Sequence, residues 1–268
     1  MSFLLFWGSV AQTAFILVVF GGGSVAGLWL VRRIVPLDQL KKNHEVAGVT
    51  FGVVGAFYGL VIAFVIVAAW ERFDQANEQA HAEAVALETL YKIGAAFSEP
   101  MRTTVDSAVV EYTKRTIDEE YPEMAREAFR MDREGAHKLW QIVLSYTPRD
   151  AKEQILMDKA IEQLNVISSE RSLRILYYEN DLPSVVWMVI YLGCVITIGF
   201  GYFFGGTVFR SQAMMCAVFS ILLGMTILAI LELAHPYQGA VTISDEPFRY
   251  ALSRMQALST YKIAKLPH

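Results

Sequence analysis

The sequence predicts an all-α, polytopic membrane protein with four transmembrane helices and a helical soluble domain inserted between spans 2 and 3. Three observations support this fold class. The chain of 268 residues is 54% hydrophobic and has a mean hydropathy of +0.36, a strongly apolar composition. Only 19% of its residues are charged, and residues 71–184 hold 14 Lys/Arg and 22 Asp/Glu of them. Long apolar stretches flank this acidic middle region on both sides.

Four apolar stretches are long enough to cross a bilayer, which takes about 20 residues for ~30 Å of hydrocarbon. They are Phe3–Val31, Gly48–Trp70, Val185–Phe204 and Gln212–Ala234. The first has no basic start, so a cleaved signal peptide is the poorer interpretation. The expected organisation is spans 1 and 2 in residues 1–70, an extramembrane helical domain in 71–184, spans 3 and 4 in 185–234, and a C-terminal tail in 235–268. These parts form one integrated unit, a multi-pass protein of the cell membrane surrounded by the lipid bilayer.

An even number of spans puts the N-terminus, the middle region and the tail on one side of the membrane. Arg32, Arg33, Lys41 and Lys42 favour a cytoplasmic first loop, but arginines also lie near the span ends on the opposite side. The sequence therefore leaves the orientation open.

The second span continues into the charged middle region without an interrupting proline. Its pattern predicts one helix over Gly48–Phe97, about 75 Å long at 1.5 Å per residue. Ala76, Ala80 and Ala84 follow helical spacing and could pack either within the subunit or against a neighbouring subunit. Prolines 100, 122 and 148 separate three further predicted helices, over about 102–120, 123–146 and 150–178. The apolar positions of the tail, which are Phe248, Tyr250, Leu252 and Met255, suggest that it folds back onto this helical domain.

Small residues mark one part of the second span. Gly48 and Gly52, and Gly55 and Gly59, have the spacing that lets transmembrane helices pack backbone to backbone. This face could pack within the subunit or line a narrow conduit that gates by dewetting.

The sequence contains no recognisable catalytic or metal-binding motif. Its five histidines are scattered, and the acidic clusters at 118–120 and 245–246 are expected to be solvated surface. We therefore expect no enzyme, no cofactor and no metal, and a pI near 5.8 makes nucleic acid an improbable partner.

Four polar residues lie at the expected membrane edges. Glu232, followed by His235, lies near the end of the fourth span and indicates either an ion path with a buried partner or simple interfacial solvation. Arg171 and Arg174, just before the third span, are candidate partners for Glu232 or contacts for lipid headgroups.

Three separated motifs resemble the bestrophin-like domain family (DUF4239) over about residues 48–258. They are "GAFYGLVIAFVIVAAWERFDQANEQAHAEAVALETLY", "ERSLRILYYENDLPSVVWMVIYLGCVITIGFGYFFG" and "LAHPYQGAVTISDEPFRYAL". The positions that carry the resemblance are Trp70, Glu83, Arg171, Arg174, Pro183, Trp187, Pro236 and Gly239.

This resemblance implies a homo-oligomer, a pentamer in bestrophins, that conducts small inorganic anions along an axis lined by span 2. It would place Gly52, Gly55, Tyr58, Ala63 and Phe64 near that axis. The calcium clasp of animal bestrophins has no counterpart in this sequence. Alternatives are a non-conducting scaffold or sensor whose helical domain binds a protein partner and, less favoured, a proton-driven motor subunit that uses Glu232.

Overall fold

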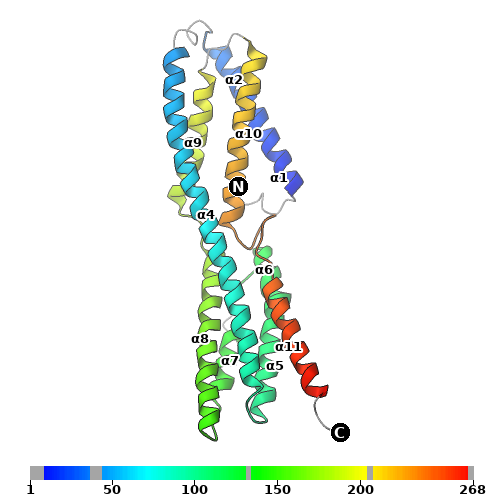
Figure 1. The fold of residues 1–268 in the computed structure, drawn as a ribbon. Helices are drawn as coiled ribbons and strands as arrows, with labels where there is room; N and C mark the ends of the chain where they lie inside the picture. The colour runs from blue at the N-terminus through cyan, green and yellow to red at the C-terminus, as the bar shows by residue number, and fades with distance from the viewer. Residues whose placement is uncertain (1–8, 37–43, 131–133, 204–207, 265–268) are drawn as a thin grey trace. The chain divides into compact units, whose positions relative to one another are not determined.

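The computed structural model describes residues 9–36, 44–130, 134–203 and 208–264, and every regular element in these ranges is a helix (Figure 1). The chain divides into two compact units. Unit 1 is Met1–Phe73, Asp181–His235 and Gly239–Val241, and unit 2 is Asp74–Asn180, Pro236–Gln238 and Thr242–His268.

Unit 1 holds the apolar helices. They are α1 (Ser9–Ile16), η2 (Leu17–Gly22), α2 (Gly23–Ile34), the part of α4 (His44–Gly94) up to Phe73, α9 (Ser184–Tyr202) and α10 (Phe209–Ala234). Four described helical segments contain a stretch long and apolar enough to cross a membrane: Val10–Ile34, Gly48–Gly94, Ala151–Tyr202 and Phe209–Ala234. The second and third of these segments also include residues of unit 2. The prediction of four long apolar helices is confirmed.

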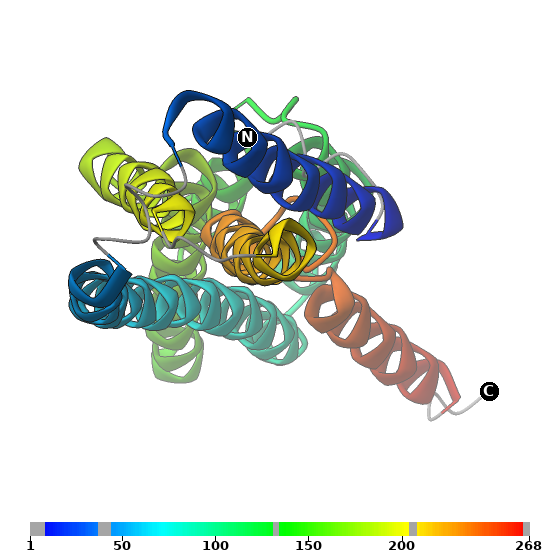
Figure 2. The same ribbon diagram turned by 90° about the horizontal axis from the view of Figure 1, so that it is seen from above.

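Helix α10 is the centre of unit 1. Seen end-on, it lies between the α1–η2–α2 segment on one side and helices α4 and α9 on the other (Figure 2). The approach of η2 to α10 depends on a glycine, because a Cβ at Gly224 would lie only 2.7 Å from Cγ of Phe20. The apolar core of the unit is made by three helices and contains Tyr58, Ile62, Ala69, Ile190, Cys194, Ile227 and Ile230.

Unit 2 is a bundle built from the rest of α4 and six further elements. These are α5 (Met101–Arg115), η3 (Thr116–Glu120), α6 (Tyr121–Ala125), α7 (Glu134–Leu144), α8 (Ala151–Glu179) and α11 (Glu246–Ala264). Ala76, Ala80 and Ala84 are buried inside this unit, which confirms packing within the subunit for the alanine row.

The uninterrupted helix predicted from the second span is confirmed as α4, which has 51 residues. The predicted helix over 123–146 is wrong, because α6 ends at Ala125 and α7 begins at Glu134, with Glu127 at a φ of 54° between them. The helix expected to end before Pro122 instead passes through it.

A wider helical turn explains how the chain passes Pro122. The Tyr121 N–H donates to the carbonyl of Thr116, five residues back, so the turn before the proline is a π-turn. A proline ring normally clashes with the carbonyl four residues earlier and leaves one hydrogen bond unmade. The wider turn gives the ring more room at that point.

The tail packs on the helical bundle, as its apolar spacing predicts. Helix α11 lies against α5 and η3, and Phe248 is fully buried with its ring 5.7 Å from that of Tyr121. Tyr250, by contrast, is exposed.

Candidate functional site

One face of α4 in unit 1 is apolar and exposed. Val53, Phe57, Leu60 and Phe64 are between 56% and 69% exposed. Each of them directly follows an exposed small residue in the sequence. These small residues are Gly52, Ala56, Gly59 and Ala63. Because a helix turns ~100° per residue, the two sets form adjacent stripes about 100° apart. We call these eight residues the open face of α4.

The two glycines of the open face are not required by packing within unit 1. Among the described residues, no heavy atom lies within 4 Å of where a Cβ would stand at Gly52 or Gly59. Gly193 of α9 is different, since a Cβ there would lie 2.2 Å from Cε2 of Tyr58. Close packing inside the unit therefore accounts for Gly193 but not for Gly52 or Gly59.

Tyr58 lies on the opposite side of α4 from the open face. It is 6% exposed, and its hydroxyl donates to the carbonyl of Ile190 at 2.6 Å. Of the five residues expected near a conduit axis, Gly52, Ala63 and Phe64 lie on the open face, and Gly55 is half-buried beside it. Tyr58 belongs to the core of unit 1 instead. Phe51, another aromatic of this span, packs on Phe219 of α10.

Glu232 is buried at the end of α10 and holds a loop. One carboxylate oxygen accepts a hydrogen bond from Nε2 of Gln12 at 2.5 Å. The other accepts from the backbone N–H groups of Ala240 and Val241, at 2.7 and 3.1 Å. Three donors thus surround this carboxylate, which makes it an anchor for the segment after α10.

The motif residues around this loop have structural roles. The Trp187 Nε1 donates to Asp181 at 3.0 Å, and His235 lies 3.7 Å from the same carboxylate. Pro183 directly precedes α9 at its N-cap. Gly239 has a φ of 89°, in the left-handed region that favours glycine. Trp70 is 58% exposed on α4.

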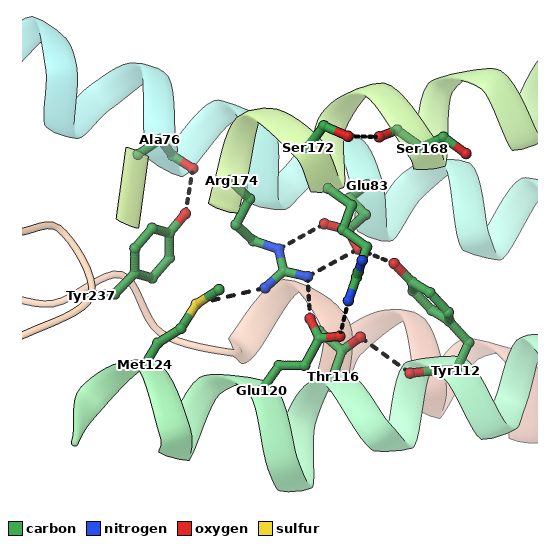
Figure 3. Close-up of polar contacts among 11 residues, drawn as sticks. Ala76, Glu83, Tyr112, Thr116, Glu120, Met124, Ser168, Ser172, Arg174 and Tyr237 are labelled. Atoms are coloured by element: carbon green, nitrogen blue, oxygen red, sulfur yellow. Dashed lines mark hydrogen bonds and ion pairs between the residues drawn. The ribbon is translucent and has the colours of Figure 1, made fainter. Parts of the chain in front are cut away.

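Arg171 and Arg174 have partners in unit 2. Arg174 is fully buried, and its Nε donates to Glu83 at 2.8 Å while its Nη2 donates to Glu120 at 2.7 Å (Figure 3). Arg171 donates to the other oxygen of Glu120 at 2.7 Å. The Tyr112 hydroxyl donates to Glu83 at 2.7 Å. The two arginines therefore neutralise Glu83 and Glu120. The donors to Glu232, which the sequence offered as their partner, are instead Gln12, Ala240 and Val241.

The electrostatics of this cluster favour the charged form of Glu120. Burial alone would raise the pKa of Glu120, but the charges of Arg174 and Arg171 lower it. Burial, together with the charges of Glu83 and Glu120, holds the pKa of Tyr112 well above its usual range. The Arg174 guanidinium also lies 5.5 and 5.7 Å from the ring centres of Tyr121 and Phe248. The cluster joins α4, α5, η3 and α8 and contacts α11.

Sequence reasoning missed Glu120 and Tyr112. Glu120 was expected to be solvated with its neighbours, and that prediction is wrong, because it is buried while Asp118 and Glu119 are exposed. A signal for Glu83 was present, since it lies on the same helical face as Ala80, Ala84 and Leu87. A carboxylate on a buried helical face requires hydrogen-bond donors or a cationic partner.

No metal site is evident in the part of the chain that the structure describes, where no group of three or more His, Cys, Asp and Glu side chains could hold an ion.

Comparison with known proteins places the chain in a family. A model of the Bestrophin-like domain matches residues 18–248. The chain belongs to the Bestrophin-like domain family. Together with its four long apolar helices, this membership makes it an integral membrane protein, and it confirms the family resemblance read from the sequence. No protein of curated function matches it significantly.

Solved structures show the same fold for this Bestrophin-like protein. A bacterial bestrophin homologue from Klebsiella pneumoniae is similar with a TM-score of 0.66 at 12% identity, covering 92% of this chain and 98% of that one. A single-residue variant of that homologue gives a TM-score of 0.67 at 12% identity, covering 92% and 99%. At this identity the likeness establishes the fold.

Proposed function

We propose that this protein forms a homo-oligomeric membrane channel of bestrophin type, in which the open face of α4 lines an anion pathway. The helical domain of unit 2 is then an insertion between spans 2 and 3, as in the family that the sequence resembles. The observation that supports the proposal is the pairing of a small-residue stripe with a large apolar stripe on the second span.

The two stripes suit a ring of subunits. In a ring of helices around an axis, each helix turns one side toward the axis and an adjacent side toward its neighbour. Small residues allow close approach of a neighbouring helix without loss of packing inside unit 1. The large residues of the next stripe, Phe57 and Phe64 among them, then project toward the axis.

An apolar constriction of this kind controls passage by dewetting. Phe57 and Phe64 are two helical turns apart, so they form two successive rings about 10 Å apart along the axis. That the permeant ion is an anion rests on the family resemblance.

The test is chloride flux from liposomes containing the purified protein, reported by a chloride-sensitive dye. We expect wild-type flux above that of empty liposomes, and a several-fold increase in Phe64→Ala because the constriction widens. Phe203→Ala is the matched control, since Phe203 is an exposed aromatic at the end of α9. Equal flux in Phe64→Ala and wild type, or no flux from intact oligomers in either orientation, contradicts the proposal. The latter outcome favours a non-conducting scaffold.

A further inference from the structure

Unit 1 has an apolar groove on the side formed by η2, α2 and α10. Its volume is about 730 Å³, within the range of about 300–1,000 Å³ that ligand pockets occupy. Small residues on both sides make the groove, and they are Gly21, Gly22, Ala26 and Ala217. The described lining contains only apolar residues and Trp29, so the groove suits a hydrocarbon chain.

Cations lie at one end of this groove. The Arg33 guanidinium is 5.1 Å from the ring centre of Trp29, and that of Arg32 is 5.3 Å from the ring centre of Phe209. Both rings line the groove. Arg32 donates to Gln212, which ties the end of α2 to the start of α10. Arg33 and Arg210, which follows Phe209, are exposed.

The length of the groove matches one leaflet of a bilayer. From Leu17 to Trp29 the η2–α2 segment rises about 18 Å, at 1.5 Å per residue. Half of a ~30 Å hydrocarbon core is about 15 Å. Arg32 and Arg33 lie near the end of the segment Val10–Ile34, and Arg210 lies at the start of the segment Phe209–Ala234. If these segments cross the bilayer, basic residues at their ends are suited to contact lipid headgroups.

We propose that this groove is a binding site for an anionic glycerophospholipid. One acyl chain of the lipid lies between η2–α2 and α10. The guanidinium groups of Arg33 and Arg210 donate charge-assisted hydrogen bonds to its phosphate oxygens. The rings of Trp29 and Phe209 lie between the apolar groove and the arginines, and Trp is a residue enriched at membrane interfaces. This site is separate from the open face of α4 and does not depend on conduction.

Native mass spectrometry of the full-length protein in detergent tests the proposal, with phosphatidylglycerol and phosphatidylcholine of identical chains added separately. We expect wild type to retain phosphatidylglycerol in preference to phosphatidylcholine. Arg33→Gln and Arg210→Gln should each lower phosphatidylglycerol retention about fivefold and leave phosphatidylcholine retention unchanged. Inorganic phosphate at millimolar concentration should not displace the lipid, because the acyl chain supplies much of the affinity.

A matched pair of variants tests the groove itself. A Cβ at Gly22 or at Gly23 meets no heavy atom within 4 Å in the described structure, yet only Gly22 lines the groove. Gly22→Leu should therefore abolish retention of both lipids, and Gly23→Leu should bind as wild type does. Ala26→Phe, which fills the groove from α2 without changing a glycine, should reproduce the loss.

Three outcomes would overturn the inference. Undiminished retention in both Gly22→Leu and Ala26→Phe would show that the groove holds no acyl chain. Equal retention of the two lipids would show that the arginines do not bind the headgroup. Displacement by free phosphate would indicate an anion site without a lipid.

Discussion

The Tyr58 hydroxyl donates to the carbonyl of Ile190 at 2.6 Å, and its ring lies over Gly193 so closely that no larger residue fits there. This contact fixes the rotation of α4 against α9. It turns Phe57 and Phe64 outward, where they are 69% and 68% exposed. The packing of Tyr58 on α9 therefore determines which side of the second span is exposed and could line a conduit.

Tyr58 should therefore affect stability rather than conduction. Tyr58→Phe keeps the ring and loses one hydrogen bond, so we expect a loss of about 1 kcal/mol or less, with chloride flux unchanged. Tyr58→Ala leaves a cavity over Gly193 and should cost about 3–5 kcal/mol. Thermal unfolding in detergent measures both. A flux change in Tyr58→Phe at wild-type stability would place the hydroxyl in the conduit.

The open face should determine assembly. Gly52→Leu adds a side chain into space that is empty within unit 1, so the subunit should fold while its approach to a neighbouring subunit is blocked. We expect native mass spectrometry to show smaller species than the wild-type oligomer. Gly199→Leu is the control, because that glycine of α9 also has no heavy atom within 4 Å of its Cβ position in the described structure. An unchanged oligomer in Gly52→Leu would show that the stripe of small residues on the open face does not lie at the subunit interface.

Arg174 should be among the most sensitive positions of unit 2. Arg174→Met leaves Glu83 buried without its cation, and losing one member of a buried pair costs about 3–5 kcal/mol. Denaturant unfolding followed by circular dichroism measures the loss. Lys159→Met removes an exposed pair with Glu162 and should cost less than about 1 kcal/mol. If both variants lose the same small amount, the buried pair does not stabilise the fold. The Glu83→Gln/Arg174→Met double variant should lose less than the two single losses added together.

Glu153 should make stability depend on acidic pH. Hydrogen bonds from the Tyr146 hydroxyl, the Ser98 hydroxyl and the Arg149 backbone N–H lower the pKa of Glu153 to about 2. Because the folded pKa lies below the unfolded value of about 4.3, this stabilisation is fully present above pH ~5. It is lost as the pH falls from about 4.3 toward about 2.

The difference in unfolding free energy between wild type and Glu153→Gln measures this effect. It should be constant above pH 5 and shrink below pH 4.3. Tyr146→Phe, which removes the largest contribution, should raise the pKa of Glu153 and narrow that window. A difference that does not vary with pH would mean that Glu153 keeps an ordinary pKa.

The sequence determined the elements of this protein because hydropathy and helix breakers act locally. Four apolar stretches of about 20 residues or more, which together carry only the charge of Glu232, predict four apolar helices wherever they lie in space. No proline lies between Gly48 and Gly94, and α4 runs through this stretch without a break. Pro122 misled the same reasoning, since a π-turn of five residues accommodates it.

Only the tertiary structure decided which way each side chain faces and what it meets. A residue number gives a position around the helix, but the direction of the core depends on neighbours distant in sequence, as Ile190 is from Tyr58. Arg174 and Glu83 are likewise 91 residues apart, and Arg174 and Glu120 are 54 apart. The charge pattern shows that these groups need partners, because an unpaired buried charge is too costly to keep. The choice of partner is made by the packing of α4, η3 and α8, which no local pattern encodes.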